Sequence, residues 1–229
     1  MTHPPAMPHG SIDEVFPDVF VVRSSFRAGV GVSFERNMTI VRQGGELVII
    51  SSARLGDAGE AQLAKLGKVT HVVRIAAFHG ADDPYYVERF GATLWGAPGM
   101  KHAVPAKELG ADATPFTKAT VFRFEKGAWP ELAIVLPVDG GVLVTGDSYQ
   151  NWTTLEHCSW LARRVMPIMG FGPTSIGKPW AKKMGPAIKE DFARLVEVPF
   201  RHLIPGHGSV LRDVARDRLP AAIAARYGS

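Results

Sequence analysis

The stretch Val69–Asp83, VTHVVRIAAFHGADD, contains the pattern that decides the fold. Residues 69–75 are rich in β-branched side chains, which favours a buried strand. Polar residues that can bind a metal or move a proton, among them His79 and Asp82, follow directly after it. Side chains at the end of a buried strand are presented by a rigid element at the rim of a sheet. We therefore expect a functional site at this rim.

The segments before this stretch alternate between strand and helix patterns. A helix is expected over 57–66, with Asp57 as its N-cap, Glu60 at capping-box spacing and Gly67 after its end. Glycine-containing links join three earlier runs of strand-forming residues, which predicts an antiparallel meander. These runs are FPDVFVVR (16–23), FERNMTIVR (34–42) and ELVIIS (46–51).

The segments after the stretch repeat the theme. A short helix is expected over 84–90, opened by Pro84 and ended by Gly91, before a strand at 93–96. Further strands are predicted at 120–126, 131–137, 141–145 and 201–204, and further helices at 187–198 and 213–227, with Pro220 marking a kink or a break. Residues 151–186, rich in Trp, Met, Gly and Pro, are expected to form a helix and an irregular lid.

Composition limits the class of protein. Of 229 residues, 46% are hydrophobic and 21% are charged, which permits one sizeable core. We expect a flexible tail over 1–10 and one domain over 11–229. The net charge of +4 is spread along the chain, so no nucleic-acid partner is predicted. No run reaches the ~18–20 apolar residues of a membrane span. Cys158 is the only cysteine, which favours a reducing, cytoplasmic setting.

Polar residues also follow two later strands. Asp147 comes after the strand GVLVT at 141–145, and His207 lies between glycines after the strand at 201–204. With His79, these residues form a set of imidazole and carboxylate groups that ends separate strands. Both groups are ligands for borderline and hard metal ions. Simpler roles are a turn for His207, a helix N-cap for Asp147, and a hydrogen bond from His79 to Asp82 or Asp83.

Over residues 16–211, the order of these elements and motifs resembles the metallo-β-lactamase superfamily. The His-x-His-x-Asp-His motif of that family falls on residues 77–82, where only His79 matches. Alanines stand at 77 and 81, and Asp82 replaces the final histidine. The family's Gly-His-x-Pro-Gly-Ser motif falls on residues 127–132, where its histidine is Ala128.

Two further motifs of the family are retained. Asp147 matches the bridging aspartate of Thr-Gly-Asp, and His207 matches the histidine of Gly-His-Gly. The resemblance implies an α/β (α+β) fold built as a four-layer αββα sandwich. It also implies that the three-histidine half of a two-metal site is nearly lost, with only His79 left.

The other half of the implied site keeps three donors, Asp82, Asp147 and His207, with His79 nearby. We therefore expect either no cofactor or a single divalent ion, zinc, manganese or iron. Asp83 is a fallback ligand if the loop is shifted by one residue. The metal-ligand candidates are thus His79, Asp82, Asp147 and His207.

Three functions follow from this inventory. The first is a pseudoenzyme or small-molecule binder, because four ligand positions are substituted. The second is a mononuclear metal-dependent hydrolase that uses Asp82, Asp147 and His207, with Asp83 or His79 as the group that moves a proton. The third is a scaffold that binds a partner through the lid at 151–186. The sequence leaves the substrate and the oligomeric state open.

Overall fold

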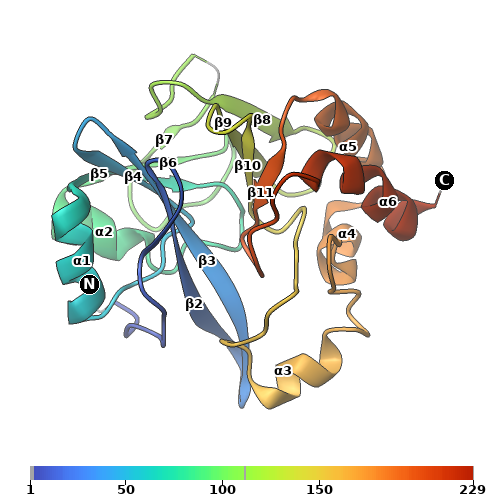
Figure 1. Cartoon of the computed structure of the whole chain (residues 1–229), viewed down its shortest axis with the longest axis horizontal. Helices are drawn as coiled ribbons and strands as arrows, with labels where there is room; N and C mark the ends of the chain where they lie inside the picture. Colours follow the sequence, from blue (N-terminus) through green and yellow to red (C-terminus); the bar gives the residue numbers. More distant parts are fainter. Residues whose placement is uncertain (1–2, 111, 229) are drawn as a thin grey trace.

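Two β-sheets pack face to face in the computed structural model, which describes residues 3–110 and 112–228 (Figure 1). The first sheet has seven strands in sequence order: β1 (Asp13–Phe16), β2 (Val19–Gly29), β3 (Val32–Gln43), β4 (Glu46–Ile50), β5 (Lys68–Arg74), β6 (Thr93–Gly96) and β7 (Ala106–Glu108). The second has the order β11-β10-β9-β8, from strands β8 (Thr120–Phe124), β9 (Glu131–Leu136), β10 (Val142–Thr145) and β11 (His202–Ile204).

Strand direction changes within the first sheet. The pairs from β1 to β4 are antiparallel, which confirms the predicted meander. From β4 to β7 the pairs are parallel. Helices α1 (Asp57–Leu66) and α2 (Asp83–Phe90) form the crossovers from β4 to β5 and from β5 to β6, and a loop connects β6 to β7. In the second sheet, β10 pairs with β9 antiparallel and with β11 parallel.

Three hydrophobic clusters separate four layers. The central cluster joins the facing sides of the two sheets. The second lies between the outer face of the first sheet and helices α1 and α2. The third lies between the second sheet and helices α4 (Lys178–Met184), α5 (Ile188–Glu197) and α6 (Ala215–Tyr227). The expected αββα sandwich is therefore confirmed (Figure 1).

Residues 152–171 of the segment that was expected to be a lid pack at the end of the long β2–β3 hairpin (Figure 1). It contains the short helix α3 (Trp160–Val165), whose N-cap Ser159 accepts a hydrogen bond from the backbone N–H of Ala162. The side chain of Trp152 and the thiol of Cys158 are buried in a fourth small cluster there. No helix among the described residues is long and apolar enough to cross a membrane.

Two expectations about helix ends are corrected. The N-cap of α1 is Gly56, and Asp57 is the first helical residue, so the capping box does not form. Pro220 lies inside α6, which continues to Tyr227, so the break does not occur, while the alternative of a kink stays a prediction. The expected C-terminal signal of α2 is confirmed, since Gly91 has the left-handed φ of 67° and its N–H binds the carbonyl of Val87.

In the N-terminal segment, residues 8–10 lie along β2, whereas His3 contacts Tyr85 and Glu88 of α2. The N–H of Gly10 donates to the carbonyl of Arg23 at 2.8 Å, and the N–H of Ser25 donates to the carbonyl of Pro8 at 3.1 Å. The ring of His9 accepts a hydrogen bond from the N–H of Gly56 at 2.9 Å. The flexible tail over 1–10 and the single domain over 11–229 stay predictions.

A close backbone contact joins the loops after β10 and β11. A Cβ atom at Gly206 would lie 2.5 Å from the carbonyl oxygen of Gly146, so only glycine fits at this point. We expect Gly206→Ala to lower the free energy of unfolding by about 2 kcal/mol, the usual cost of overpacking. Gly29→Ala is the control, because nothing lies within 4 Å of its Cβ position. Equal stabilities of the two variants, measured by chemical denaturation, would contradict this packing.

Candidate metal centre

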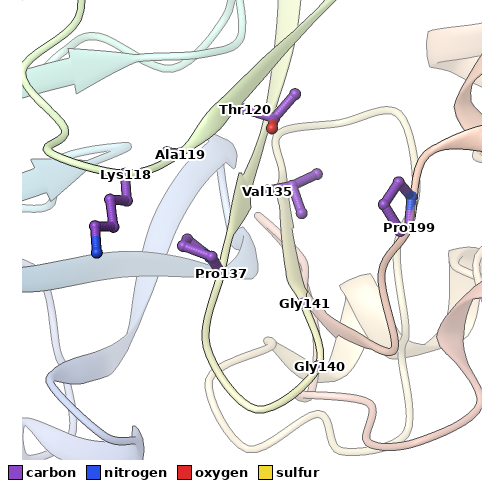
Figure 2. A pocket seen from close by; sticks show the side chains of 8 residues that line it. All are labelled: Lys118, Ala119, Thr120, Val135, Pro137, Gly140, Gly141 and Pro199. Atoms are coloured by element: carbon purple, nitrogen blue, oxygen red, sulfur yellow. The ribbon is translucent and has the colours of Figure 1, made fainter.

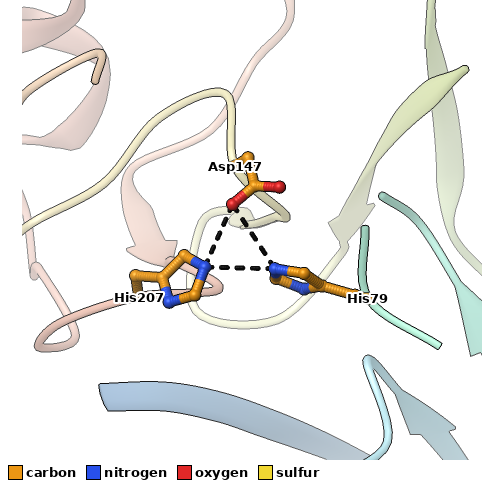
Figure 3. Close-up of side chains that lie close together, drawn as sticks. All are labelled: His79, Asp147 and His207. Atoms are coloured by element: carbon orange, nitrogen blue, oxygen red, sulfur yellow. Dashed lines mark hydrogen bonds and ion pairs between the residues drawn. The ribbon is translucent and has the colours of Figure 1, made fainter. Parts of the chain in front are cut away.

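Three side chains from three loops converge at one rim of the sandwich. His79 follows β5, Asp147 follows β10 and His207 follows β11. The Nε2 of His207 lies 3.0 Å from Oδ1 of Asp147, and the Nε2 of His79 lies 3.4 Å from the same oxygen. The two Nε2 atoms are 3.1 Å apart. Figure 3 shows all three polar ends directed at one another.

His207 is held on several sides. Its Nδ1 lies 2.7 Å from the carbonyl oxygen of Glu35, and because a carbonyl only accepts, Nδ1 carries the proton. The ring stacks on Trp152 with centroids 5.5 Å apart and planes 9° apart, and Phe26 packs against it at 5.5 Å. In the neutral ring, Nε2 therefore has its lone pair free toward the rim. A ring N–H that donates to a backbone carbonyl while the other nitrogen faces the site is typical of metal-binding histidines.

Asn37 on β3 holds the loop that contains His207. Its side-chain amide donates to the carbonyls of Pro205 at 2.8 Å and Gly208 at 2.7 Å. Its backbone N–H donates to the carbonyl of Gly206 at 2.8 Å. These bonds connect the loop after β11 to the opposite sheet, so the position of His207 depends on both sheets.

The buried side chain of Glu131 holds the backbone of the loop that contains Asp147. Its Oε1 accepts the backbone N–H groups of Asp147 at 3.0 Å and Ser148 at 2.8 Å, and its Oε2 accepts the indole N–H of Trp180 at 2.8 Å. Burial and the Asp147 carboxylate raise the pKa of Glu131 to about 8, against the effect of these donors. The sequence analysis did not identify Glu131. The available signal was a glutamate where the resembled motif has a glycine.

The two histidines at the rim determine the charge of the Asp147 carboxylate. Burial on its own would raise the pKa of Asp147, but the adjacent His79 and His207 hold it well below its ordinary value. The Asp147 carboxylate is therefore ionised at neutral pH. An ionised carboxylate in contact with two imidazoles can bind a divalent cation.

Asp82, a predicted ligand, has another partner. Its carboxylate forms an ion pair with the guanidinium of Arg36 on β3, and the Asp82 side chain is only 3% exposed. Asp82 is therefore outside the three-residue cluster, although it lines the same cavity. Its assignment as a ligand stays a prediction.

Asp83 is also outside the cluster. It is the first residue of α2, and its Oδ1 accepts a hydrogen bond from the hydroxyl of Ser52 at 2.6 Å. Its Oδ2 is buried and has no hydrogen-bond partner among the described residues. Asp83 does not line the cavity at the rim.

Two of the simpler roles do not occur. His79 contacts His207 and Asp147 rather than Asp82 or Asp83. Asp147 caps no helix, because the next helix along the chain, α3, begins at Trp160.

A cavity of about 550 Å³ lies over the three residues. It is lined by all three, by Phe26, Arg27 and Arg36 of the β2–β3 hairpin, by residues 78–82, and by Pro4, Pro5 and Met7 of the N-terminal segment. A second depression, of about 530 Å³, lies beside β8 and β9 (Figure 2). Lys118 is the only charged residue of the eight that line it, so it offers no comparable chemistry.

The donor set at the rim suits one metal ion. One ligand atom from each of His79, Asp147 and His207 lies within 4.8 Å of the others. Two imidazole nitrogens and one carboxylate oxygen are ligands that zinc, manganese and iron accept, and three protein ligands leave a position open for water or substrate. The residues therefore fit a single divalent ion.

Solved structures with the same fold are metallo-β-lactamases. FIM-1 from Pseudomonas aeruginosa, in a mono-zinc form, gives a TM-score of 0.69 at 13% identity over 97% of each chain. DIM-1 exposed to ceftazidime gives 0.65 at 14% identity over 96% of this chain and 98% of its own. A metallo-β-lactamase from Erythrobacter litoralis gives 0.61 at 12% identity over 93% and 92%. The chain therefore has the metallo-β-lactamase fold. No family model and no curated protein matches the sequence.

Burial of Asp83 makes stability depend on pH. Burial raises the pKa of Asp83 from 3.8 to about 6, so between these values the folded state keeps a proton that the unfolded state releases. This contribution to stability is present below pH 4 and is lost as pH rises through 6. At about 1.36 kcal/mol per pKa unit, the loss is about 3 kcal/mol. We expect the stability of Asp83→Asn, minus that of the wild type, to increase by this amount from pH 4 to 7.

The measurement is chemical denaturation of both proteins across this pH range. Asp57→Asn, which removes an exposed carboxylate, is the control for the loss of one charge. A difference between Asp83→Asn and wild type that does not change with pH would contradict the assignment.

Proposed function

We propose that this chain is a mononuclear metal-dependent hydrolase whose ion is held by His79, Asp147 and His207. The observation that supports it best is the convergence of the two Nε2 atoms on Oδ1 of Asp147, at 3.0 and 3.4 Å. This ligand set differs from the sequence-based set, because His79 takes the place of Asp82. Asp82 is left out of the ligand set because its carboxylate forms an ion pair with Arg36.

The substitutions argue for one ion rather than two. Alanines at 77, 81 and 128 have no donor atoms, and Asp82 is neutralised by Arg36. A second ion would have too few protein ligands left to bind it. FIM-1, which has the same fold, is described in a mono-zinc form, and this supports a fold that accommodates a single ion.

The roles of the protein groups follow from their contacts. A bound divalent ion supplies Lewis acidity and lowers the pKa of a water molecule. Asp147 offsets the charge of the ion, and Glu131 fixes Asp147 through its backbone N–H. The carbonyl of Glu35 fixes the tautomer of His207. Trp152 and Phe26 exclude water from one side of His207.

A non-catalytic small-molecule binder is the second candidate. It is favoured by the substituted ligand positions and by the absence of Asp83 from the cavity lining, which removes one of the two groups expected to move a proton. Both candidates use the same cavity, so they differ only in whether a bound molecule is hydrolysed.

Metal stoichiometry tests the ligand set. Protein purified without chelator and then equilibrated with zinc, manganese or iron(II) is expected to retain one equivalent of at least one of these ions. His207→Ala should retain less than a tenth of that, because two protein ligands hold an ion poorly. His102→Gln, which changes a half-buried histidine outside the cluster, should retain the wild-type amount. Two equivalents, or full retention in His207→Ala, would refute the set.

Turnover separates the two candidates. We expect the metal-loaded protein to hydrolyse at least one of three chromogenic probes: 4-nitrophenyl acetate, bis(4-nitrophenyl) phosphate or nitrocefin. Chelation should abolish the reaction, the ion should restore it, and Asp147→Asn should lower kcat/KM by at least a hundredfold. If one equivalent of metal is bound but no probe is hydrolysed in a metal-dependent reaction, the protein is a small-molecule binder and not a hydrolase.

A further inference from the structure

Arg36 is a largely buried cation, and most of its N–H donors have no hydrogen-bond partner among the described residues. Its side chain is 13% exposed, and its one hydrogen bond to the described residues runs from Nη2 to Asp82. Its Nε is buried and has no partner among those residues. A guanidinium has five N–H donors in a planar fork, and it is never deprotonated in proteins. Arg36 lines the cavity over the metal centre, so the guanidinium donors that Asp82 does not occupy, apart from the buried Nε–H, are available to a ligand there.

We propose that this cavity binds an organic anion, a carboxylate or a phosphate group on an apolar body, and that Arg36 binds the anionic group. The proposal rests on the proposed function for the position of the reacting bond and adds the class of ligand. Arg36 is offered as a specificity-determining residue.

The formal charges that line the cavity balance one another, and a divalent ion at the centre would make their total positive. Arg27 and Arg36 contribute two positive charges, and Asp82 and Asp147 contribute two negative ones, so the lining is neutral when the histidines are neutral. A divalent ion at the centre would bring the total to about +2 by the same count. Arg27 is exposed and has no ion pair among the described residues, so its charge is also free for a ligand.

The remaining wall is apolar. Pro4, Pro5 and Met7 line one part of it, and Phe26 and Phe78 line others. The volume of about 550 Å³ is in the range of small-molecule sites. An apolar body in contact with these side chains would be removed from water while its anionic group reaches the guanidinium.

The N-terminal segment is fixed in this wall by the chain around it. The carbonyl of Pro4 accepts a hydrogen bond from Arg54 at 2.5 Å, and the carbonyl of Pro8 accepts the N–H of Ser25 at 3.1 Å. The segment therefore contributes its side chains to the cavity from a defined position.

Arg36 is tied to the metal centre through neighbouring residues. Glu35, the preceding residue, accepts the ring N–H of His207, and Asp82, the partner of Arg36, is three residues after His79. An anion bound at Arg36 thus leaves the adjacent part of the same molecule over the three ligands. Asp82 holds Nη2 and limits rotation of the guanidinium, so it is a positioning residue for Arg36.

Binding of three matched probes tests the proposal: phenylacetate, phenylphosphonate and the neutral 2-phenylethanol, measured by calorimetry. We expect at least one of the two anions to bind at least tenfold more tightly than 2-phenylethanol, since hydrogen bonds to charged groups exceed neutral ones by this margin. A preference for one anion identifies whether the natural group is a carboxylate or a phosphate. Equal binding of all three probes, or no binding, overturns the proposal.

A neutral pair replaces the ion pair in the decisive variant. Arg36→Gln with Asp82→Asn avoids leaving Asp82 buried without a partner, which would destabilise the fold. We expect it to lose the anion preference and to keep its affinity for 2-phenylethanol. Arg36→Lys retains the charge and should keep part of the preference. An unchanged preference in the double variant shows that Arg36 does not bind the anion. Should the double variant not fold, Arg27→Gln and the wild-type ranking of the probes remain as tests.

Each titration is made on chelator-treated and on metal-loaded protein. A preference for the anions that appears in both protein samples and depends on Arg36 supports the proposal even when no ion is retained. Failure of the proposed function is therefore distinguished from failure of anion binding. A preference that appears only with the ion, and that the double variant keeps, means that the anion binds the ion alone and overturns the role of Arg36.

Discussion

The hydrogen bond between Nδ1 of His207 and the carbonyl of Glu35 connects the two sheets at the rim. Glu35 belongs to β3 of the seven-stranded sheet, and His207 follows β11 of the four-stranded sheet. The bond fixes both the tautomer and the orientation of the ring, so Nε2 faces Asp147. Asn37, two residues after Glu35, holds the same loop by three further bonds. The packing of the two sheets against each other therefore also determines the geometry of the candidate metal centre.

The second support is a buried acid in contact with an ionised one. Glu131 is completely buried and accepts the backbone N–H of Asp147, while the Asp147 carboxylate faces the two histidines. Two carboxylates this close destabilise each other when both are charged. A divalent ion at the histidines would offset the charge of Asp147, so the arrangement is electrostatically matched to a cation. Trp180 and Ser148 donate the other hydrogen bonds to Glu131, so the loop after β10 is anchored to a buried side chain.

Strand ends made His79, Asp147 and His207 predictable, because a polar residue after a buried strand must lie at a sheet rim. The αββα sandwich was predictable because the order of strands and helices, together with the motifs after them, resembles the metallo-β-lactamase superfamily over residues 16–211. The ion pair between Asp82 and Arg36 was not predictable from the sequence. Arg36 is 46 residues away from Asp82, and in the sequence it looks like an ordinary polar residue of a strand. Glu131 and Asn37 also look like strand residues. Their roles come from contacts between the sheets, which local patterns do not contain.

The proposed centre holds a single ion between His79, Asp147 and His207. Crystals grown with zinc or manganese, and measured on both sides of the absorption edge of the metal, test this directly. We expect one anomalous peak within coordination distance of Nε2 of His79, Oδ1 of Asp147 and Nε2 of His207, with the ion pair between Arg36 and Asp82 intact. No peak at this position, a second peak beside it, or an ion coordinated by Asp82 in place of His79 would contradict it.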